Sequence, residues 1–211
     1  MTDHDGNIYS TVQVGDQVWT KENFRCTHYN NGKKIPNVTG DREWSNLSTG
    51  ALCYYNNQLP RYAEKYGALY NWYAVNTGKL APEGWHVPSH DEWTKLVDYL
   101  IDNGYNWYDT TIYNETGKSL AAKTDWYSDT TEGNIGNDVA NNNSTGFTAL
   151  PGGCRNLHGG YYNMKIGSHW WSSTECNESN AFYRYLKYSR SRLEFCDFNK
   201  KFGFAIRFIK D

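Results

Sequence analysis

The spacing of hydrophobic side chains predicts short strands near both ends of the chain. Between Ile8 and Trp19, residues with strand preference flank the turn signal Gly15-Asp16, so we expect a β-hairpin there. Further short strands are predicted in the second half of the chain, at 147–150, 170–173, 182–188 and 204–209. No internal repeat or linker-like segment occurs, so we expect a single domain over residues 1–211.

Two segments have apolar side chains at helical spacing. The first covers about 66 to 76, and Gly78 follows it as a stop signal. The second begins with a capping box, in which Ser89 is the N-cap and Glu92 occupies the third helical position. Its apolar stripe ends before Asn103-Gly104 and consists of Trp93, Leu96, Val97, Leu100 and Ile101.

Two long polar segments are expected to be ordered loops. The segment 29–57 is rich in turn residues, and we expect Trp44 and the Tyr54-Tyr55 pair to hold it in place. The segment 105–145 is long for a loop without structure of its own. It is either a functional excursion or fixed by Trp107 and Trp126.

The aromatic content changes the expected core. The 211-residue chain has 9 Trp, 18 Tyr and 8 Phe, so large rings should fill much of its interior. Buried Tyr hydroxyls and indole N–H groups need hydrogen-bond partners. This composition favours an irregular fold with long hydrogen-bonded loops over an aliphatic bundle.

The charge pattern argues against two classes of partner. The formal net charge is -2 and basic residues gather only in the short run 189–192, so nucleic acid is not an expected ligand. No apolar run approaches about 20 residues, so direct membrane insertion is not expected. From the polar, acidic start of the sequence, residues 1–6, we expect no signal peptide in this segment. A cytoplasmic protein, a phage-borne protein and one whose signal has been removed all fit, and a cell surface or phage particle is the expected location.

Residues typical of catalysis or metal binding occur without the spacing that such sites need. His86 and His90 are four residues apart, but Pro88 lies between them and the helix begins only at Ser89, so they cannot share a helix face. No nucleophile elbow, P-loop or H-E-x-x-H sequence occurs. The cysteines form no C-x-x-C pair, and we expect buried fillers or surface thiols at Cys26, Cys53, Cys154, Cys176 and Cys196. We therefore expect no enzymatic activity and no cofactor.

One segment offers oxygen ligands for a divalent cation. Calcium prefers carboxylate and amide oxygens, which residues 129–138 supply at Asp129, Glu132, Asn134, Asn137 and Asp138. The spacing matches no EF-hand. A solvated loop whose Asx side chains cap turns is the alternative.

The last third of the chain, from Gly152, combines a regular skeleton with unusual residues between its anchors. If 182–188 is a strand, Phe182, Arg184, Leu186 and Tyr188 share one face, and Tyr183 and Tyr185 share the other. Phe182 and Leu186 mark the first face as inward, with Arg184 buried and hydrogen-bonded. The second face then displays two tyrosines to solvent, as binding paratopes do. The alternative is that both rings pack beneath the polar loop as a second layer.

The skeleton resembles the Fibrobacter succinogenes major paralogous domain over nearly the whole chain. In the first half the matching stretches are Gly6-x-x-Tyr9-x-Thr11-Val12-x-Val14-Gly15-x-Gln17-x-Trp19-x-x-Glu22-Asn23, Tyr66–Trp72 and Gly84-Trp85-His86-Val87-Pro88-x-x-x-Glu92-Trp93. In the second half they are Gly146-Phe147-x-Ala149-Leu150-Pro151-Gly152-Gly153-x-Arg155, Trp171–Glu175 and Gly203–Arg207.

The resemblance implies an α+β, C-type lectin-like fold in the branch shared with formylglycine-generating enzymes. Two helices would lie around short, twisted antiparallel strands with long ordered loops. The enzymes of that branch depend on a close pair of cysteines. Cys154, Cys176 and Cys196 do not reproduce that pair in sequence, which argues against oxidase activity.

The same fold carries the variable proteins of diversity-generating retroelements, whose carboxy-terminal region is altered at template adenines. Asn codons mutate to a set that includes Tyr, Ser, Arg, His, Phe, Cys, Asp and Leu but excludes Trp, Met, Lys, Gln and Glu. Residues 152–211 are the candidate variable region. The candidate ligand-binding residues, which fit that set, are His158, Tyr161, Tyr162, His169, Tyr183, Tyr185, Tyr188, Ser189, Arg190, Ser191, Arg192, Phe195, Asp197 and Phe198. Leu157, Cys176 and Cys196 fit it too, whereas Glu178, Lys187, Glu194, Lys200 and Lys201 do not.

The resemblance thus predicts a display protein for a macromolecular ligand, such as a protein or a cell-surface component. The candidate residues would form one solvent-facing patch. One alternative is a non-diversified bacterial surface or lipoprotein domain with a structural or carbohydrate-associated role. An oxidase-like or metal enzyme is the other.

Overall fold

Small antiparallel sheets and few helices make up the protein. The computed structural model describes residues 1–59, 62–108, 111 and 113–211. The strands are β1 (Thr11–Val14), β2 (Gln17–Thr20), β3 (Leu52–Cys53), β4 (Leu69–Tyr70), β5 (Trp85–His86), β6 (Gly152–Arg155), β7 (Tyr161–Met164), β8 (Gly167–Glu175), β9 (Asn180–Lys187), β10 (Glu194–Asn199) and β11 (Ile209–Lys210). The helices are α1 (Asp41–Ser45), α2 (Ala63–Tyr66), α3 (Trp72–Val75), α4 (His90–Asp102) and α5 (Gly117–Leu120), with short 3-10 turns at Tyr55–Asn57 and Val139–Asn141. The expected α+β class is therefore confirmed.

The amino-terminal hairpin and the last strand belong to one sheet. β1 and β2 pair antiparallel around Gly15-Asp16, as the sequence predicts. The sheet order is β1-β2-β11-β5, in which Ile209 lies opposite both Trp19 and His86. Backbone pairing thereby joins the hairpin near residue 20 to the segment near residue 209.

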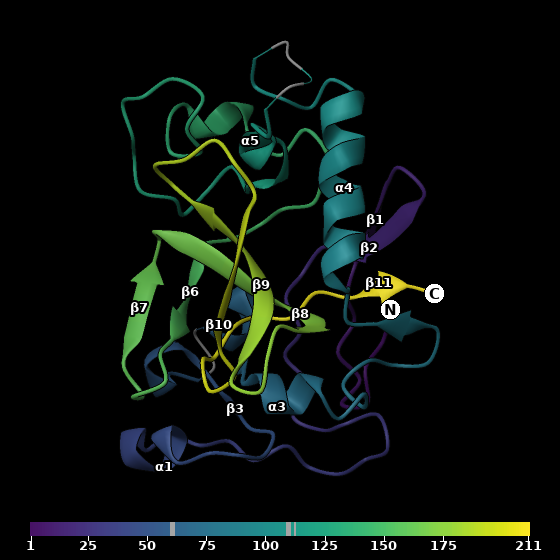
Figure 1. Ribbon diagram of the computed structural model, residues 1–211, viewed down its shortest axis with the longest axis vertical. Coiled ribbons are helices and arrows are strands. Elements are labelled where there is room, and N and C mark those ends of the chain that lie inside the picture. Colours follow the sequence, from purple (N-terminus) through teal and green to yellow (C-terminus); the bar gives the residue numbers. More distant parts are fainter. Residues whose placement is uncertain (60–61, 109–110, 112) are drawn as a thin grey trace.

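Helix α4 forms as its local sequence predicts. The Ser89 side chain accepts the backbone N–H of Glu92, and the Glu92 carboxylate accepts the backbone N–H of Ser89, which completes the capping box. The apolar stripe packs inward against a cluster of rings. The ring of Trp93 lies 4.6 Å from Trp19 and 5.9 Å from Trp170, centroid to centroid. Figure 1 shows α4 running along one side of the strands.

The helix predicted over 66–76 is wrong. The chain instead forms α2, the short strand β4 and then α3. Gly67 adopts φ +79, which ends α2, and Leu69–Tyr70 pairs with β3 rather than continuing a helix. The side chain of Asn71 then caps α3 by accepting the backbone N–H of Ala74. The long-range strand pairing and this new cap together outweigh the local helical spacing.

The carboxy-terminal strands confirm part of the prediction. Residues 170–173 lie in β8, and 182–187 lie in β9. The strand predicted at 147–150 is wrong, since Ala149 forms only an isolated bridge to Ala121 and the strand begins at Gly152. Of the segment 204–209, only its end forms a strand, β11. The Phe204 and Ala205 backbones instead bridge separately to Tyr70 and Trp170.

The predicted aromatic core and ordered loops are confirmed. Six tryptophans are fully buried, at positions 19, 44, 72, 93, 170 and 171. Trp44 anchors the 29–57 loop by donating its indole N–H to the Lys201 carbonyl at 2.8 Å. In the second loop Trp126 is buried, whereas Trp107 stays half exposed. No helix in the described part of the chain is long and apolar enough to cross a membrane.

His86 and His90 do not share a helix face, in line with the sequence. His86 instead joins Asp211 to the start of α4. His86 Nε2 lies 2.6 Å from a Glu92 carboxylate oxygen, and His86 Nδ1 lies 2.6 Å from a carboxylate oxygen of Asp211. Burial disfavours the charged ring, but hydrogen bonds to Asp211 and Glu92 outweigh it and raise the pKa of His86 above 6.5.

This bridge predicts a pH-dependent contribution to stability. Because the pKa is raised on folding, the contribution should be complete below about pH 6.5 and disappear as the pH rises through the folded-state pKa. We expect His86→Gln to lower Tm more at about pH 6 than at about pH 9. Thermal denaturation of both proteins at the two pH values tests this, and an equal difference at both would contradict it.

Candidate functional site

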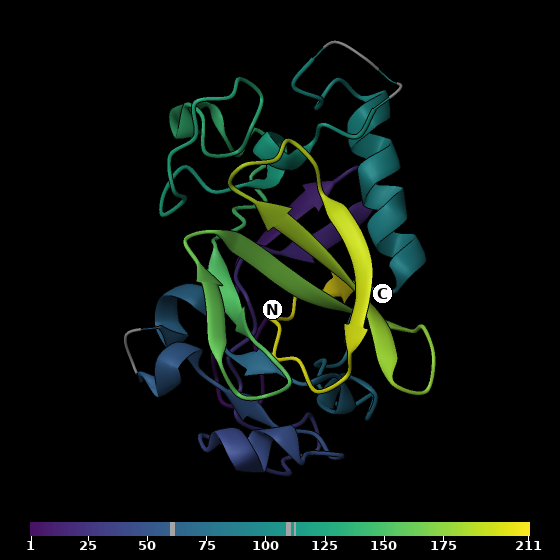
Figure 2. The same ribbon diagram turned by 60° about the vertical axis from the view of Figure 1, so that its left-hand side comes forward.

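Strand β9 positions most of the candidate binding residues. It lies in the middle of a three-stranded antiparallel sheet with the order β10-β9-β8. Its register places Tyr185 opposite His169 on β8, and Tyr183 opposite Cys196 on β10. Figure 2 shows the β6–β7 hairpin beside this sheet. Alternate residues of β9 therefore point either toward α4 or toward the opposite side, where the hairpin and the 203–205 segment lie.

The face toward α4 is inward, as predicted. Leu186 is fully buried, and the Arg184 guanidinium donates to the His90 carbonyl at 3.0 Å and to the Thr94 hydroxyl at 2.6 Å. Phe182 is half-buried against the His90 ring. Arg184 therefore ties the sheet to the first turn of α4.

The opposite face carries a stack of rings. The sequence predicts that this face displays its tyrosines to solvent, and the structure shows that it does not do so for Tyr183. Tyr183 is 4% exposed and His169 is 8% exposed. The Tyr183 ring lies 4.7 Å from Phe204 and 5.4 Å from Tyr185, with interplanar angles of 28° and 19°. The segment near Ala205 runs parallel beside β8, with the Ala205 N–H donating to the His169 carbonyl, and the Phe204 ring stacks on His169 at 5.3 Å. The alternative interpretation, in which the ring is packed in a second layer, is thus correct for Tyr183. Tyr185, by contrast, is only half-buried.

A groove of about 280 Å³ opens over this stack. Its floor is formed by His169 and Tyr183, and its walls include Tyr185, Arg190 and Phe198. The remaining lining residues are Asn163, Ile166, Gly167, Leu186, Lys187 and Glu194. Rings at the base with charged and amide groups at the rim suit the recognition of a ligand that is partly apolar and partly polar.

His169 contributes a neutral ring to this groove. Burial lowers its pKa to about 4, so the imidazole is uncharged near neutral pH. Its Nε2 lies 3.2 Å from the Asn163 side-chain amide, while its Nδ1 is buried and has no partner among the described residues. Sequence reasoning missed Asn163, because only the β6–β7 hairpin register brings it beside β8.

The candidate residues of the β6–β7 hairpin have different roles. His158 and Tyr162 are exposed. Tyr161 is half-buried, its hydroxyl lies 2.7 Å from the Asn57 side-chain oxygen, and its ring covers the guanidinium of Arg155 at 5.0 Å. His158 and Tyr162 therefore remain candidates for ligand contact, whereas Tyr161 is engaged in packing.

The β9–β10 loop presents a cluster of candidate side chains on a fixed backbone. The carbonyls of residues 188, 190 and 191 accept N–H groups from Gly136, Ile135 and Gly117. Tyr188 is half-buried against Tyr127, and the other candidate side chains of this loop are half-buried or exposed, at Ser189, Arg190, Ser191 and Arg192. The polar 105–145 segment therefore supports the β9–β10 loop. Through these hydrogen bonds the segment is connected to the candidate site.

Strand β10 sends candidate residues to both faces of the sheet. Phe198 is 41% exposed on the groove side, 5.2 Å from Tyr183. Phe195 is 56% exposed but lies over His90 and the Arg184 guanidinium, on the α4 side. Asp197 accepts a hydrogen bond from the Asn180 amide at 2.8 Å. The prediction of a single patch is therefore wrong, because the alternation of side chains divides the residues between the groove, the loop and the α4 side.

The segment predicted to offer calcium ligands holds an internal cation. Lys118 is buried, and its ammonium donates to the backbone carbonyls of Asn134, Asn137 and Asp138. The Asp129 carboxylate accepts the Thr131 N–H and the Asn134 amide, closing the turn between them. Because the Asp129 carboxylate caps a turn and three backbone carbonyls face Lys118, the arrangement resembles the alternative of a turn-capped loop.

The other candidate chemistry is dispersed. The cysteines are all free, with Cys26, Cys53 and Cys154 buried and Cys176 and Cys196 exposed, as the sequence predicts. Burial raises the pKa of the Cys154 thiol to about 12, which makes it a poor nucleophile. Among the residues that the structure describes, no three His, Cys, Asp or Glu side chains gather to hold a metal ion.

Comparison with known proteins gives one match. The family model described as the Fibrobacter succinogenes major domain matches residues 12–210. No curated protein and no solved structure shows a significant match to the chain. The matched range includes the hairpin, the capped helix and every strand of the groove, and therefore most of the chain. The protein belongs to the Fibrobacter succinogenes major domain family.

Proposed function

We propose that the protein is a ligand-binding module, not an enzyme, whose groove and neighbouring β9–β10 loop recognise a macromolecular ligand. The observation that carries this proposal is the groove of about 280 Å³, whose candidate binding residues lie on a rigidly held sheet. Exposed rings such as Phe198 supply contact area at low entropic cost, and the Arg190 and Ser189 side chains supply polar contacts. A protein or a cell-surface component has the size to cover both the groove and the loop.

We further propose that a retroelement diversifies this surface and that the fold is C-type lectin-like. Strand β11 beside the amino-terminal hairpin, the capped helix α4 and the long ordered loops support the fold. Exposure supports diversification, since Arg190, Phe195 and Phe198 can change without disturbing the core. Their neighbours Trp170, Trp171 and Arg184, by contrast, are buried anchors.

Sequencing the gene in a bacterial or phage population tests diversification. We expect substitutions at the codons of Tyr185, Arg190 and Phe198, restricted to residues that an altered Asn codon can encode. The codons of Trp171 and Arg184 serve as internal controls and should not vary. A reverse transcriptase gene and a near-identical, Asn-codon-rich repeat should lie nearby.

Two results would overturn diversification. If the codons of Trp171 and Tyr185 vary equally, mutation is not directed to the groove. If no reverse transcriptase and no repeat accompany the gene, the remaining candidate is the non-diversified surface domain with a structural or carbohydrate-associated role.

A further inference from the structure

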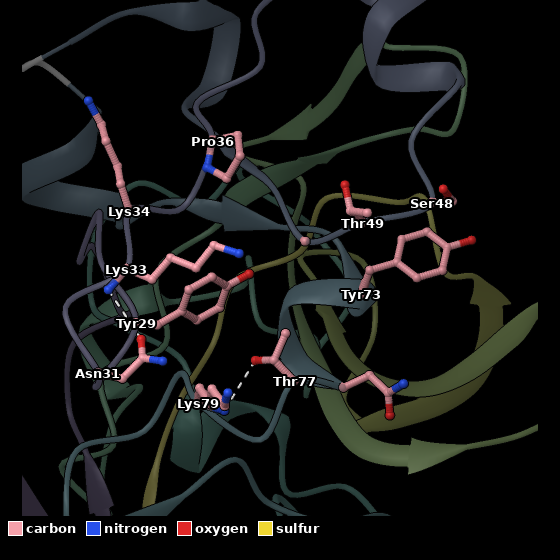
Figure 3. A pocket seen from close by; sticks show the side chains of 12 residues that line it. Tyr29, Asn31, Lys33, Lys34, Pro36, Ser48, Thr49, Tyr73, Thr77 and Lys79 are labelled. Carbon is pink, nitrogen blue, oxygen red and sulfur yellow. Dashed lines mark hydrogen bonds between the residues drawn. The ribbon is translucent and has the colours of Figure 1, made fainter.

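A larger cavity lies away from the candidate variable residues. It is an open hollow of about 640 Å³, lined by the 29–36 loop, residues 48–50 and the region of α3 (Figure 3). Helices α1 and α3 lie at one end of the molecule, and α5 lies at the other, next to the β9–β10 loop (Figure 1). All lining residues precede Gly152. The cavity is therefore separate from the groove and does not depend on the proposed function.

The cavity is positively charged. Lys33, Lys34 and Lys79 line it, and none of the described residues that line it is acidic. Within the described chain none of these lysines has an ion-pair partner, whereas Lys65, Lys95 and Lys200 are each paired with a carboxylate. The three lysine side chains are exposed and the Lys34 ammonium points away in Figure 3, so Lys33 and Lys79 are the cations that can attract an anionic ligand to the cavity.

A tyrosine hydroxyl is accessible from the cavity. Tyr29 is 6% exposed, and among the described residues its hydroxyl has no hydrogen-bond partner. Burial raises the pKa of Tyr29, so this hydroxyl stays protonated and can donate. Gly50 makes room for it, because a Cβ there would lie 2.2 Å from the Tyr29 oxygen. A ligand in the cavity can therefore accept a hydrogen bond from this hydroxyl.

The remaining lining groups are suited to a hydroxylated molecule. The Ser48 and Thr49 hydroxyls and the Asn76 amide also make no side-chain hydrogen bond within the described chain. The Tyr73 ring, on the side opposite Tyr29 in Figure 3, offers an apolar surface. Small hydroxyl and amide groups match the hydroxyls of a sugar ring, and a tyrosine face packs on its C–H groups.

We propose that this cavity binds an acidic saccharide, a sugar that carries a carboxylate or a phosphate. Lys33 and Lys79 pair with the anionic group, and the Tyr29 hydroxyl and its neighbours bind the sugar hydroxyls. The volume falls within the range of about 300–1,000 Å³ that small-molecule sites occupy.

Calorimetric titration of the whole chain tests this with four probes. Digalacturonic acid presents a carboxylate and glucose 6-phosphate presents a phosphate, so these two probes distinguish the sources of the charge. Glucose and inorganic phosphate supply the ring alone and the anion alone. At low ionic strength we expect at least one acidic sugar to bind about tenfold more tightly than both glucose and phosphate.

Three variants connect that binding to the cavity. The double variant Lys33→Gln/Lys79→Gln should weaken it about tenfold or more, and Tyr29→Phe should weaken it by about threefold to tenfold. Lys123→Gln, an exposed lysine outside the cavity, is the matched control and should leave it within about twofold. Melting temperatures close to that of the parent confirm that each variant is folded.

Several results would overturn the proposal. The first is that neither acidic sugar binds. The second is that inorganic phosphate alone binds as tightly as the two acidic sugars do. Equal losses in Lys123→Gln and the double variant would show that the attraction is a property of net charge alone. Unchanged binding in both the double variant and Tyr29→Phe would place the site elsewhere.

Discussion

Replacing Arg207 with methionine should lower the free energy of unfolding by about 3–5 kcal/mol, the largest effect that we expect from a single substitution. Its guanidinium is 1% exposed and donates to the carbonyls of Thr20, Phe147 and Thr148 and to the Asn23 side-chain oxygen. Methionine fills much of the same volume but donates no hydrogen bond. The substitution therefore leaves several buried oxygens without partners.

Chemical denaturation of the purified variant measures this effect. Arg192→Met is the matched control, because Arg192 is exposed, and its free energy of unfolding should change by less than about 0.5 kcal/mol. Similar losses in the two variants would mean that the hydrogen bonds of Arg207 contribute little to stability.

The second large effect concerns the floor of the groove. Tyr183→Ser should cost about 3 kcal/mol, because it removes a ring that packs against Phe204, Tyr185 and Phe198 and leaves a cavity. Tyr185→Ser should cost less than about 1 kcal/mol, since Tyr185 is half-buried at the groove wall. Both substitutions are available to an altered Asn codon.

This pair separates two kinds of candidate variable position. Denaturant titration gives both stabilities, and equal losses would contradict the assignment of floor and wall. If the difference is as expected, substitutions at Tyr183 are limited by folding even where mutation reaches its codon. Tyr185 can then vary more freely.

The parts of the fold that the sequence predicts are those with local causes. The capping box at Ser89 and the apolar stripe after it predict α4 from neighbouring residues alone. The turn Gly15-Asp16 predicts the first hairpin in the same way. The break of the 66–76 helix depends on pairing between β3 and β4, a contact that helical spacing does not reveal.

The candidate site follows the same rule. Alternation along one strand separates Arg184 from Tyr183 and Tyr185, and the inward role of Arg184 is confirmed. Which face is covered depends on the chain near Phe204 and on β10, neither of which has a hydrophobic period that predicts its position. The burial of Tyr183 and His169 was therefore outside the reach of strand alternation.

Strand β10 lies at the edge of its sheet, which affects self-association. An edge strand with exposed Phe195 and Phe198 is a template on which another copy can pair and begin to aggregate. Glu194 at the start of the strand carries a charge that opposes such pairing, whereas Lys200 just after the strand is buried and paired with Glu175. An altered Asn codon does not encode Glu. If this surface is diversified as proposed, its rings can therefore change while the charge that opposes pairing between copies is kept.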